Sequence, residues 1–211
     1  MDKYREDFYQ DFKEYIENNV DLTRKIYGVS IVPIHIYSGE DEKLTGKACV
    51  VLGKERDGIY TDKFNFFGGK VEVKDGCESK IECICSSLFD EAYEEMGYIL
   101  TAAKFEKSIV KVLQTDFSNG SSLLFICHLT GISRTKWKDV IQDRLKNKYL
   151  EWKYQEMSEI EHIAIEDIQL RKDISLYVKQ NMYNLIPLYK FLNRCNNIYI
   201  GNFKNTFGMK L

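Results

Sequence analysis

The ten residues FDEAYEEMGY, from Phe89 to Tyr98, concentrate acidic side chains beside a glycine. On an α-helix, residues three and four positions apart share a face, so Glu91, Glu94 and Glu95 would lie within an arc of roughly 100°. Carboxylate oxygens are ligands that Mg²⁺ and Mn²⁺ prefer, and a divalent ion would cancel the repulsion among these like charges. The pattern therefore indicates a metal site, and its simpler alternative is a solvated acidic edge of a helix.

The residues around this stretch predict the helix that would carry it. Apolar residues recur three, four, seven and eight positions apart from Ile81 to Met96, which predicts a helix over residues 79–96 with Gly97 as its stop. In projection, the three glutamates flank the apolar stripe and do not occupy the opposite, fully solvated side. We therefore expect the carboxylates to face a cleft where this helix packs on a sheet.

The rest of the chain has the pattern of a β-rich domain with helices at both ends. Alternating apolar residues between turn residues predict strands, and apolar spacings of three and four predict helices. The expected helices lie in residues 3–20, 134–157 and 174–195. The expected strands lie in residues 27–37, 47–55, 104–114, 122–132 and 159–168, and residues 56–73 should hold a turn and an aromatic strand that ends at the Gly68-Gly69 pair. The strands in 104–114 and 122–132 should form a hairpin.

Length and charge limit the classes of protein to which this chain could belong. The 211 residues, 44% of them hydrophobic, are enough for one sizeable core. With 30 basic and 32 acidic residues the net charge is −2, which gives no overall bias toward nucleic acid or a membrane surface. No apolar run approaches the roughly 18 residues of a membrane span, and the N-terminus is charged where a signal peptide would be apolar. We therefore expect a cytoplasmic protein.

Cysteine and histidine are distributed as structural residues. The six cysteines include no CxxC pair, which disfavours both a zinc ribbon and a disulfide framework. Each histidine, at His35, His128 and His162, falls within an expected strand, and no second histidine or cysteine stands at ligand spacing. We interpret each histidine as a half-buried strand residue, not as a metal ligand.

The acidic helix and the segment before it resemble the signature of the Nudix hydrolases, GX5EX7REUXEEXGU, in which U is aliphatic. The stretch DEAYEEMGY matches the REUXEEXGU half, and Gly68, Gly69 and Glu72 match the family's GGxxE element. Asp90 stands where the family has an arginine, and Phe67 stands where a proline usually precedes the two glycines.

Two further residues, Gly76 and Glu82, satisfy the literal spacing of the signature. The glycine that matches the family's structure is Gly69, which implies a loop and early helix about seven residues longer than usual. On the expected helix, Glu82 would point about 180° away from Glu91. We therefore expect Glu82 to stay outside a metal site.

The resemblance implies an α/β/α sandwich with a mixed β-sheet, plus N-terminal and C-terminal helices. It also implies metal-dependent hydrolysis of a diphosphate linkage in a nucleoside diphosphate derivative, such as a nucleotide sugar or a dinucleotide, which releases a nucleoside phosphate and a phosphorylated moiety. We expect a helical extension over residues 1–26, a Nudix-like hydrolase domain over 27–192 and a tail over 193–211.

The same resemblance implies roles for individual residues. Glu91 and Glu94 would be catalytic, with Glu91 acting as a ligand or as a base. The implied ligands of Mg²⁺ or Mn²⁺ are Glu72, the Gly69 carbonyl, Glu91, Glu94 and Glu95. The implied substrate contacts are Gly68, Lys70 and Phe66, and a later acid would be Glu156 or Glu159.

Three functions remain open from the sequence. The first is hydrolysis of a small nucleoside diphosphate derivative. The second is mRNA decapping, because the basic residues of 134–149, interleaved with Trp137, could follow an RNA backbone. The third is a degenerate Nudix domain that binds a nucleotide without hydrolysis, which Asp90 favours. The expected partner is therefore a nucleotide-containing small molecule or capped RNA.

Overall fold

The computed structural model describes residues 3–37, 41–72, 79–96, 109–128, 157–182 and 185–187. Within these ranges the chain forms two long helices, seven strands and a short 3₁₀ helix, followed by further helical turns over residues 176–182 and 185–187. The helices are α1 (Lys3–Asn19), α2 (Lys80–Met96) and the 3₁₀ helix η1 (Ile165–Asp167). The strands are β1 (Ile26–Ile36), β2 (Ala48–Glu55), β3 (Phe64–Asn65), β4 (Phe67–Lys70), β5 (Ile109–Phe117), β6 (Gly120–His128) and β7 (Met157–Ala164).

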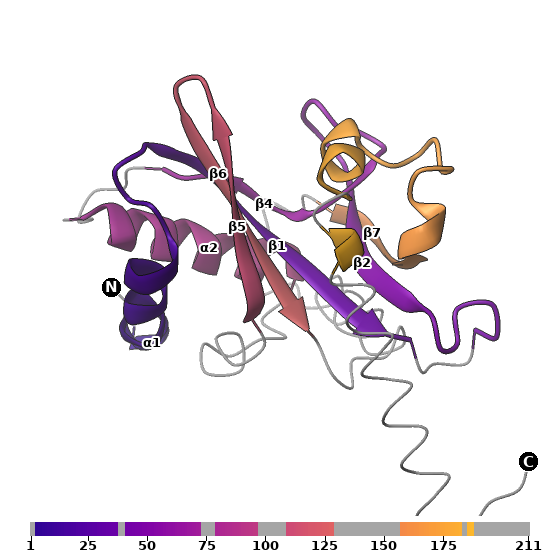
Figure 1. Cartoon of the computed structure of the whole chain (residues 1–211), viewed down its shortest axis with the longest axis horizontal. Helices are drawn as coiled ribbons and strands as arrows, with labels where there is room; N and C mark the ends of the chain where they lie inside the picture. Colours follow the sequence, from indigo (N-terminus) through magenta and orange to yellow (C-terminus); the bar gives the residue numbers. More distant parts are fainter. Residues whose placement is uncertain are drawn as a thin grey trace, which may run out of the picture.

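The seven strands form one mixed sheet in the order β3-β2-β1-β6-β5, with β4 added beside β1 and β7 beside β2 (Figure 1). β1 and β6 are parallel, and the other strand pairs are antiparallel. On the edge of β1 away from β6, residues 28–31 pair with β4 and residues 34–36 pair with β2. β1 is therefore paired along both edges, at the centre of the sheet.

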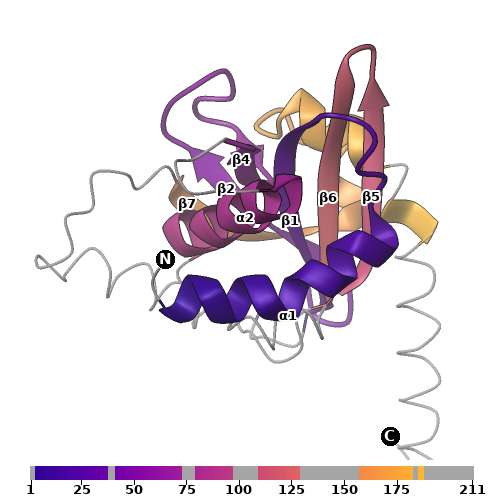
Figure 2. The ribbon, with the colours of Figure 1, turned by 90° about the vertical axis from the view of Figure 1, so that its left-hand side faces the viewer.

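Helices cover both faces of the sheet. α1 and α2 lie on one face, and the helical turns after residue 175 lie on the other (Figures 1 and 2). Each side has its own apolar cluster: Phe12, Leu88 and Phe125 belong to the first, and Val50, Phe66 and Val178 belong to the second. The predicted α/β/α sandwich with a mixed sheet and helices toward both ends of the chain is thus confirmed.

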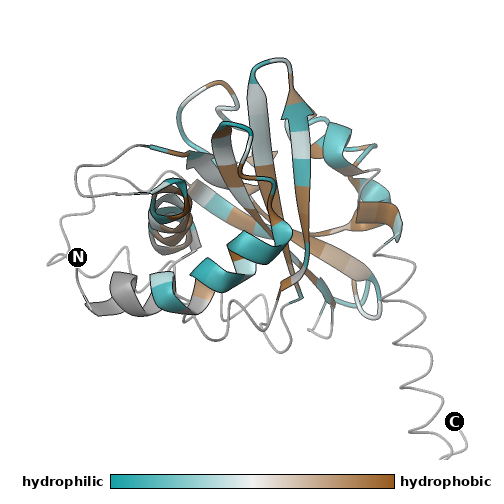
Figure 3. Cartoon of the chain, turned by 60° about the vertical axis from the view of Figure 1, so that its left-hand side comes forward, coloured by the Kyte–Doolittle hydropathy of each residue, from teal (hydrophilic) through white to brown (hydrophobic). Residues whose placement is uncertain are grey.

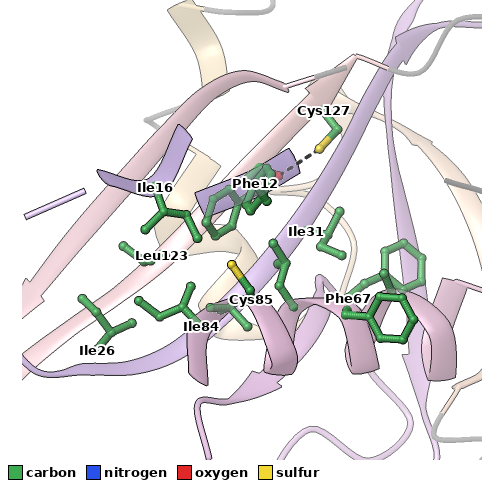
Figure 4. Close-up of a cluster of buried hydrophobic side chains, with 14 of the residues drawn as sticks. Phe12, Ile16, Ile26, Ile31, Phe67, Ile84, Cys85, Leu123 and Cys127 are labelled. Atoms are coloured by element: carbon green, nitrogen blue, oxygen red, sulfur yellow. Dashed lines mark hydrogen bonds between the residues drawn. The ribbon is translucent and has the colours of Figure 1, made fainter. Parts of the chain in front are cut away.

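The first cluster fixes α2 on the sheet. Ile84 and Cys85 of α2 belong to this cluster together with Ile31 of β1 and with Phe12 and Ile16 of α1 (Figure 4). Full burial of a side chain of this size contributes about 1.5–3 kcal/mol. Figure 3 shows hydrophobic colours on α2 and the strands, whereas the coloured part of α1 is mainly hydrophilic on its outer side. α2 is therefore held by packing along its length, which sets the position of its acidic residues.

Most boundaries agree with the sequence prediction, but the expected aromatic strand is divided into β3 and β4, and the last strand is displaced. α2 occupies residues 80–96, as its apolar spacing predicted, and β5 and β6 form the predicted hairpin. The last strand begins at Met157 and ends at Ala164, where we had expected residues 159–168. Residues 165–167 form a 3₁₀ turn, which keeps Ile165 buried although the strand has ended. The helix expected in 134–157 lies almost entirely outside the described residues.

None of the helices in the described ranges combines the length and the apolar character that crossing a lipid bilayer requires.

Candidate functional site

The first turn of α2 is closed by a reciprocal pair of hydrogen bonds. The backbone N–H of Glu82 donates to Ser79 Oγ at 3.2 Å, and the backbone N–H of Ser79 donates to Glu82 Oε2 at 3.1 Å. This arrangement is a capping box, in which a serine and a glutamate three residues later satisfy amides that the helix leaves open. Glu82 therefore caps the helix. This capping role accounts for a glutamate at the position that matches the literal signature.

The acidic end of α2 runs beside β4 and the residues that follow β4. The backbone N–H of Gly68 donates to Glu95 Oε2 at 2.5 Å, and the backbone N–H of Glu72 donates to Ser87 Oγ at 3.2 Å. Between these two contacts, the Glu91 carboxylate lies against Gly69. Residues 87, 91 and 95 share one helix face, so this face follows residues 68–72 in the opposite chain direction.

The two glycines are required for different reasons. Gly68 has φ +149°, a region that other residues rarely adopt, and a Cβ there would collide with the backbone of Val29 on β1. Gly69 has no such backbone demand, but a Cβ there would collide with the carboxylate of Glu91. Gly68 thus permits β4 to pair with β1, while Gly69 leaves room for an acidic side chain.

Of the carboxylates at this end of α2, those whose side chains the structure describes do not form a solvated edge. Glu95 is 5% exposed and Asp90 is 7% exposed, and the Oε2 atom of Glu91 is buried. A charged acceptor forms a stronger hydrogen bond than a neutral one, so the Gly68 amide stabilises the ionised form of Glu95. Asp90 lies in the buried part of the helix surface.

The structure brings together some of the predicted site residues and separates others. Glu91, Glu95 and the glycine pair meet as described, and Lys70 is exposed at the end of β4. Phe66 is 1% exposed in the second apolar cluster, on the other face of the sheet, where its ring meets Tyr177.

The remaining predicted acids are dispersed or lie outside the described part of the chain. Glu72 is exposed beside α2, and Glu159 is exposed on β7 opposite Lys54 of β2. The side chain of Glu94 and all of Glu156 lie outside the described residues.

The donor set at α2 suits a hard divalent cation by its chemistry. Glu91 and Glu95 offer carboxylate oxygens, and the buried position of both groups favours a nearby positive charge. Among the side chains that the structure describes, no three histidine, cysteine or acidic groups are arranged to hold an ion. Glu94 belongs to the same helix, and its side chain lies outside the described residues.

Two of the histidines that we expected to be half-buried form a buried pair. His35 of β1 and His162 of β7 are 6% and 2% exposed, and their Nε2 and Nδ1 atoms lie 2.7 Å apart. Burial lowers the pKa of His35 to about 4, with a smaller effect in the same direction from His128 and an opposite one from a hydrogen bond with the Ile36 backbone. The two histidines are 127 positions apart, so no spacing rule could have joined them.

Comparisons with known proteins were of three kinds. No family model matches this sequence, and a search of curated proteins gave no match. Among solved structures, the NUDIX domain of Shewanella oneidensis NrtR, in complex with ADP ribose, aligns with 83% of this chain and 94% of its own, at 10% identity and a TM-score of 0.42. A MutT protein from Methanosarcina mazei aligns with 83% of this chain and 99% of its own, at 12% identity and a TM-score of 0.39.

A further match is a bifunctional NMN adenylyltransferase/ADP ribose pyrophosphatase from Francisella tularensis, in complex with AMP and a Mn ion. It aligns with 88% of this chain at 10% identity and a TM-score of 0.45, and this chain spans 47% of its length. All three matched structures therefore have sequences very different from this one.

Proposed function

We propose that this protein is a metal-dependent hydrolase that cleaves a diphosphate linkage in a nucleoside diphosphate derivative. The observation that carries the proposal is the contact between α2 and the glycine pair, with Glu95 accepting the Gly68 amide and Glu91 filling the space beside Gly69. These are the two segments that match the Nudix signature, and their contact supports the proposal.

Each residue in this arrangement has a role that follows from its position. Glu91, Glu94 and Glu95 would hold Mg²⁺ or Mn²⁺, with Glu72 and the Gly69 carbonyl as further oxygen donors. When bound, such an ion neutralises charge on a diphosphate and lowers the pKa of an attacking water. Glu95 also accepts the hydrogen bond from the Gly68 amide near the start of β4. This bond holds the glycine backbone at a constant distance from the helix. Glu91 is the carboxylate best placed beside Gly69 to accept a proton from water.

A substrate screen with matched variants tests this proposal. Nucleotide sugars, dinucleotides, ADP-ribose and capped RNA would be incubated with the protein and Mg²⁺ or Mn²⁺, and the products separated by chromatography. Glu94→Gln and Glu95→Gln should lower kcat by on the order of 10²-fold or more. Glu82→Gln is the control, because it makes the same chemical change on the same helix while glutamine still serves in a capping box. Wild-type turnover in both site variants would contradict the metal site.

The decapping alternative has its own arm in this screen. Its basic segment, residues 134–149, lies outside the described residues, so support for it remains the sequence pattern. If lysines and arginines of this segment contact phosphates, cleavage of capped RNA should fall with added salt more steeply than cleavage of a dinucleotide. Equal salt dependence of the two reactions would argue against an RNA groove.

A second candidate function, nucleotide binding without hydrolysis, is favoured by Asp90. Its carboxylate is 7% exposed at the position where the Nudix signature has an arginine, so α2 lacks the cation that would offset its acids there. A nucleotide that raises the melting temperature in the presence of Mg²⁺, yet remains intact after prolonged incubation, would identify a binding domain. Product formation that depends on Glu94 and Glu95 would identify the hydrolase.

A further inference from the structure

A buried serine lies in the middle of α2, one helical turn before Glu91. Ser87 is 3% exposed, and its neighbours Ile84, Cys85 and Leu88 belong to the first apolar cluster. Serine forms a helix less readily than alanine, and a buried hydroxyl destabilises the fold unless it has a hydrogen-bond partner. Packing alone would therefore favour alanine at position 87.

The partner of this hydroxyl is the chain that leaves β4. β4 pairs with β1 as far as Lys70, and the next amide, that of Val71, donates to the Tyr27 carbonyl at 2.9 Å. Glu72 follows, and its amide donates to Ser87 Oγ at 3.2 Å. The chain thus passes from the sheet to the helix at Glu72, and Ser87 fixes its backbone there.

This bond and the bond from Gly68 to Glu95 hold one short segment at both of its ends. Along the helix, Ser87 and Glu95 are separated by about 12 Å at a rise of 1.5 Å per residue. Along an extended chain, Gly68 and Glu72 are separated by about 13 Å. The two lengths agree, so residues 68–72 are extended beside α2, with Glu91 between the two bonds.

The bond between Glu72 and Ser87 contributes little to folding. Glu72 is exposed, so water can replace the serine hydroxyl as the acceptor of its amide. Water does not, however, give the residue a fixed position. Ser87 therefore lowers the intrinsic stability of the helix and restricts Glu72, and a local rule broken in this way is typical of a functional site.

We infer that Ser87 is a positioning residue that holds Glu72 for a divalent cation at α2. The inference rests on the proposed function, in which Glu72 is one of the oxygen donors. Ser87 acts through Glu72: it fixes the backbone from which the carboxylate extends, about 6 Å along the helix axis from Glu91. A ligand that is already held in place loses less conformational freedom when the ion binds, so Ser87 raises the affinity of the site.

Titration of the metal-free, full-length protein with Mn²⁺ tests this role without a substrate. Ser87→Ala should weaken Mn²⁺ binding by about tenfold, as expected when a group that orients a ligand is removed. Its melting temperature without metal should stay the same or rise, because alanine favours the helix and leaves no buried hydroxyl. Unchanged affinity, or a melting temperature that falls together with the affinity, would overturn the inference.

Ser86→Ala is the matched control. It makes the same chemical change at the adjacent, half-buried position, about 100° around the helix from Ser87. We expect this variant to bind Mn²⁺ as tightly as the wild-type protein does. Equal weakening by the two variants would show a general effect of the helix on the site and would refute a specific role for Ser87.

Glu72→Gln shows whether Ser87 acts through Glu72. This change alone should weaken Mn²⁺ binding, and Ser87→Ala should add little to it, because the carboxylate that Ser87 positions is already lost. Full additivity of the two changes would overturn the inference. Exchange of the Glu72 amide proton should also be faster in Ser87→Ala than in the wild-type protein, and an unchanged rate would show that the amide does not depend on Ser87.

Wild-type protein and Glu95→Gln separate a failure of this inference from a failure of the proposed function. If the wild-type protein binds no Mn²⁺, or binds it no better than Glu95→Gln does, the metal site is refuted and the role of Ser87 with it. If Glu95→Gln loses the binding while Ser87→Ala retains it in full, the metal site stands and only the role of Ser87 is refuted.

Discussion

At the residue scale, the neighbouring glycines Gly68 and Gly69 serve different purposes. Gly68 is needed for the fold, and Gly69 is needed for the site. Gly68 meets the backbone of β1, which cannot move away, whereas Gly69 meets only the end of a flexible glutamate side chain. A methyl group would therefore have different effects at the two positions, although the chemical change is the same.

We expect Gly69→Ala to displace the Glu91 carboxylate and to lower kcat strongly, while the melting temperature changes little. Gly68→Ala should instead destabilise the fold by several kcal/mol, because it combines a positive φ with a backbone collision. Thermal unfolding and turnover of both variants would be measured together. A Gly69→Ala protein with full activity would show that Glu91 has no part in the chemistry.

Glu95 allows a binding test that does not require a known substrate. If the carboxylates of α2 hold a divalent cation, Mn²⁺ should raise the melting temperature of the wild-type protein by preferential binding to the folded state. Glu95→Gln should lose most of this increase, and Glu82→Gln should retain it. An increase of the same size in all three proteins would place the bound ion elsewhere.

At the element scale, α2 was predictable because local signals agree. Its apolar spacing predicts its length. The sequence Ser79-x-x-Glu82 is that of a capping box, although our sequence analysis considered Glu82 only as a match to the literal signature. The partners of β3 and β4 were not predictable. The continuous aromatic stretch breaks at Phe66, so that β3 pairs with β2 and β4 pairs with β1. Such a change of partner depends on contacts remote in sequence, as does the pairing of His35 with His162.

The capping box gives a prediction for α2 as an element. Ser79→Ala should lower the free energy of unfolding by about 1 kcal/mol, because an amide in the first helical turn loses its partner. Glu82→Ala should cost a similar or smaller amount, and the double variant should cost less than the sum of the two, since the bonds are reciprocal. Chemical denaturation would measure all three. Full additivity would mean that the two side chains act independently.

At the scale of the whole molecule, the buried histidine pair links stability to pH. The unfolded chain binds a proton at His35 below about pH 6.5, whereas the folded protein binds it only near pH 4. Stability should therefore fall as the pH is lowered from 6.5 to 4, by about 3 kcal/mol from this residue. His35→Gln should flatten this part of the profile, which urea unfolding at each pH would record. An unchanged slope in the variant would assign the pH dependence to other groups.

β1 is paired along both edges, and the glycine pair and the histidine pair lie at different points along it. Val29 and Ile31 share a cluster with α2, and strand alternation places His35 on the same face. From Ser30, opposite Gly68, to His35 the strand advances about 16 Å. A central strand exchanges its amide protons only when the whole domain opens. β1 therefore holds the glycine pair and the histidine pair at a constant separation, so that a ligand bound beside the glycine pair would slow amide exchange near both pairs.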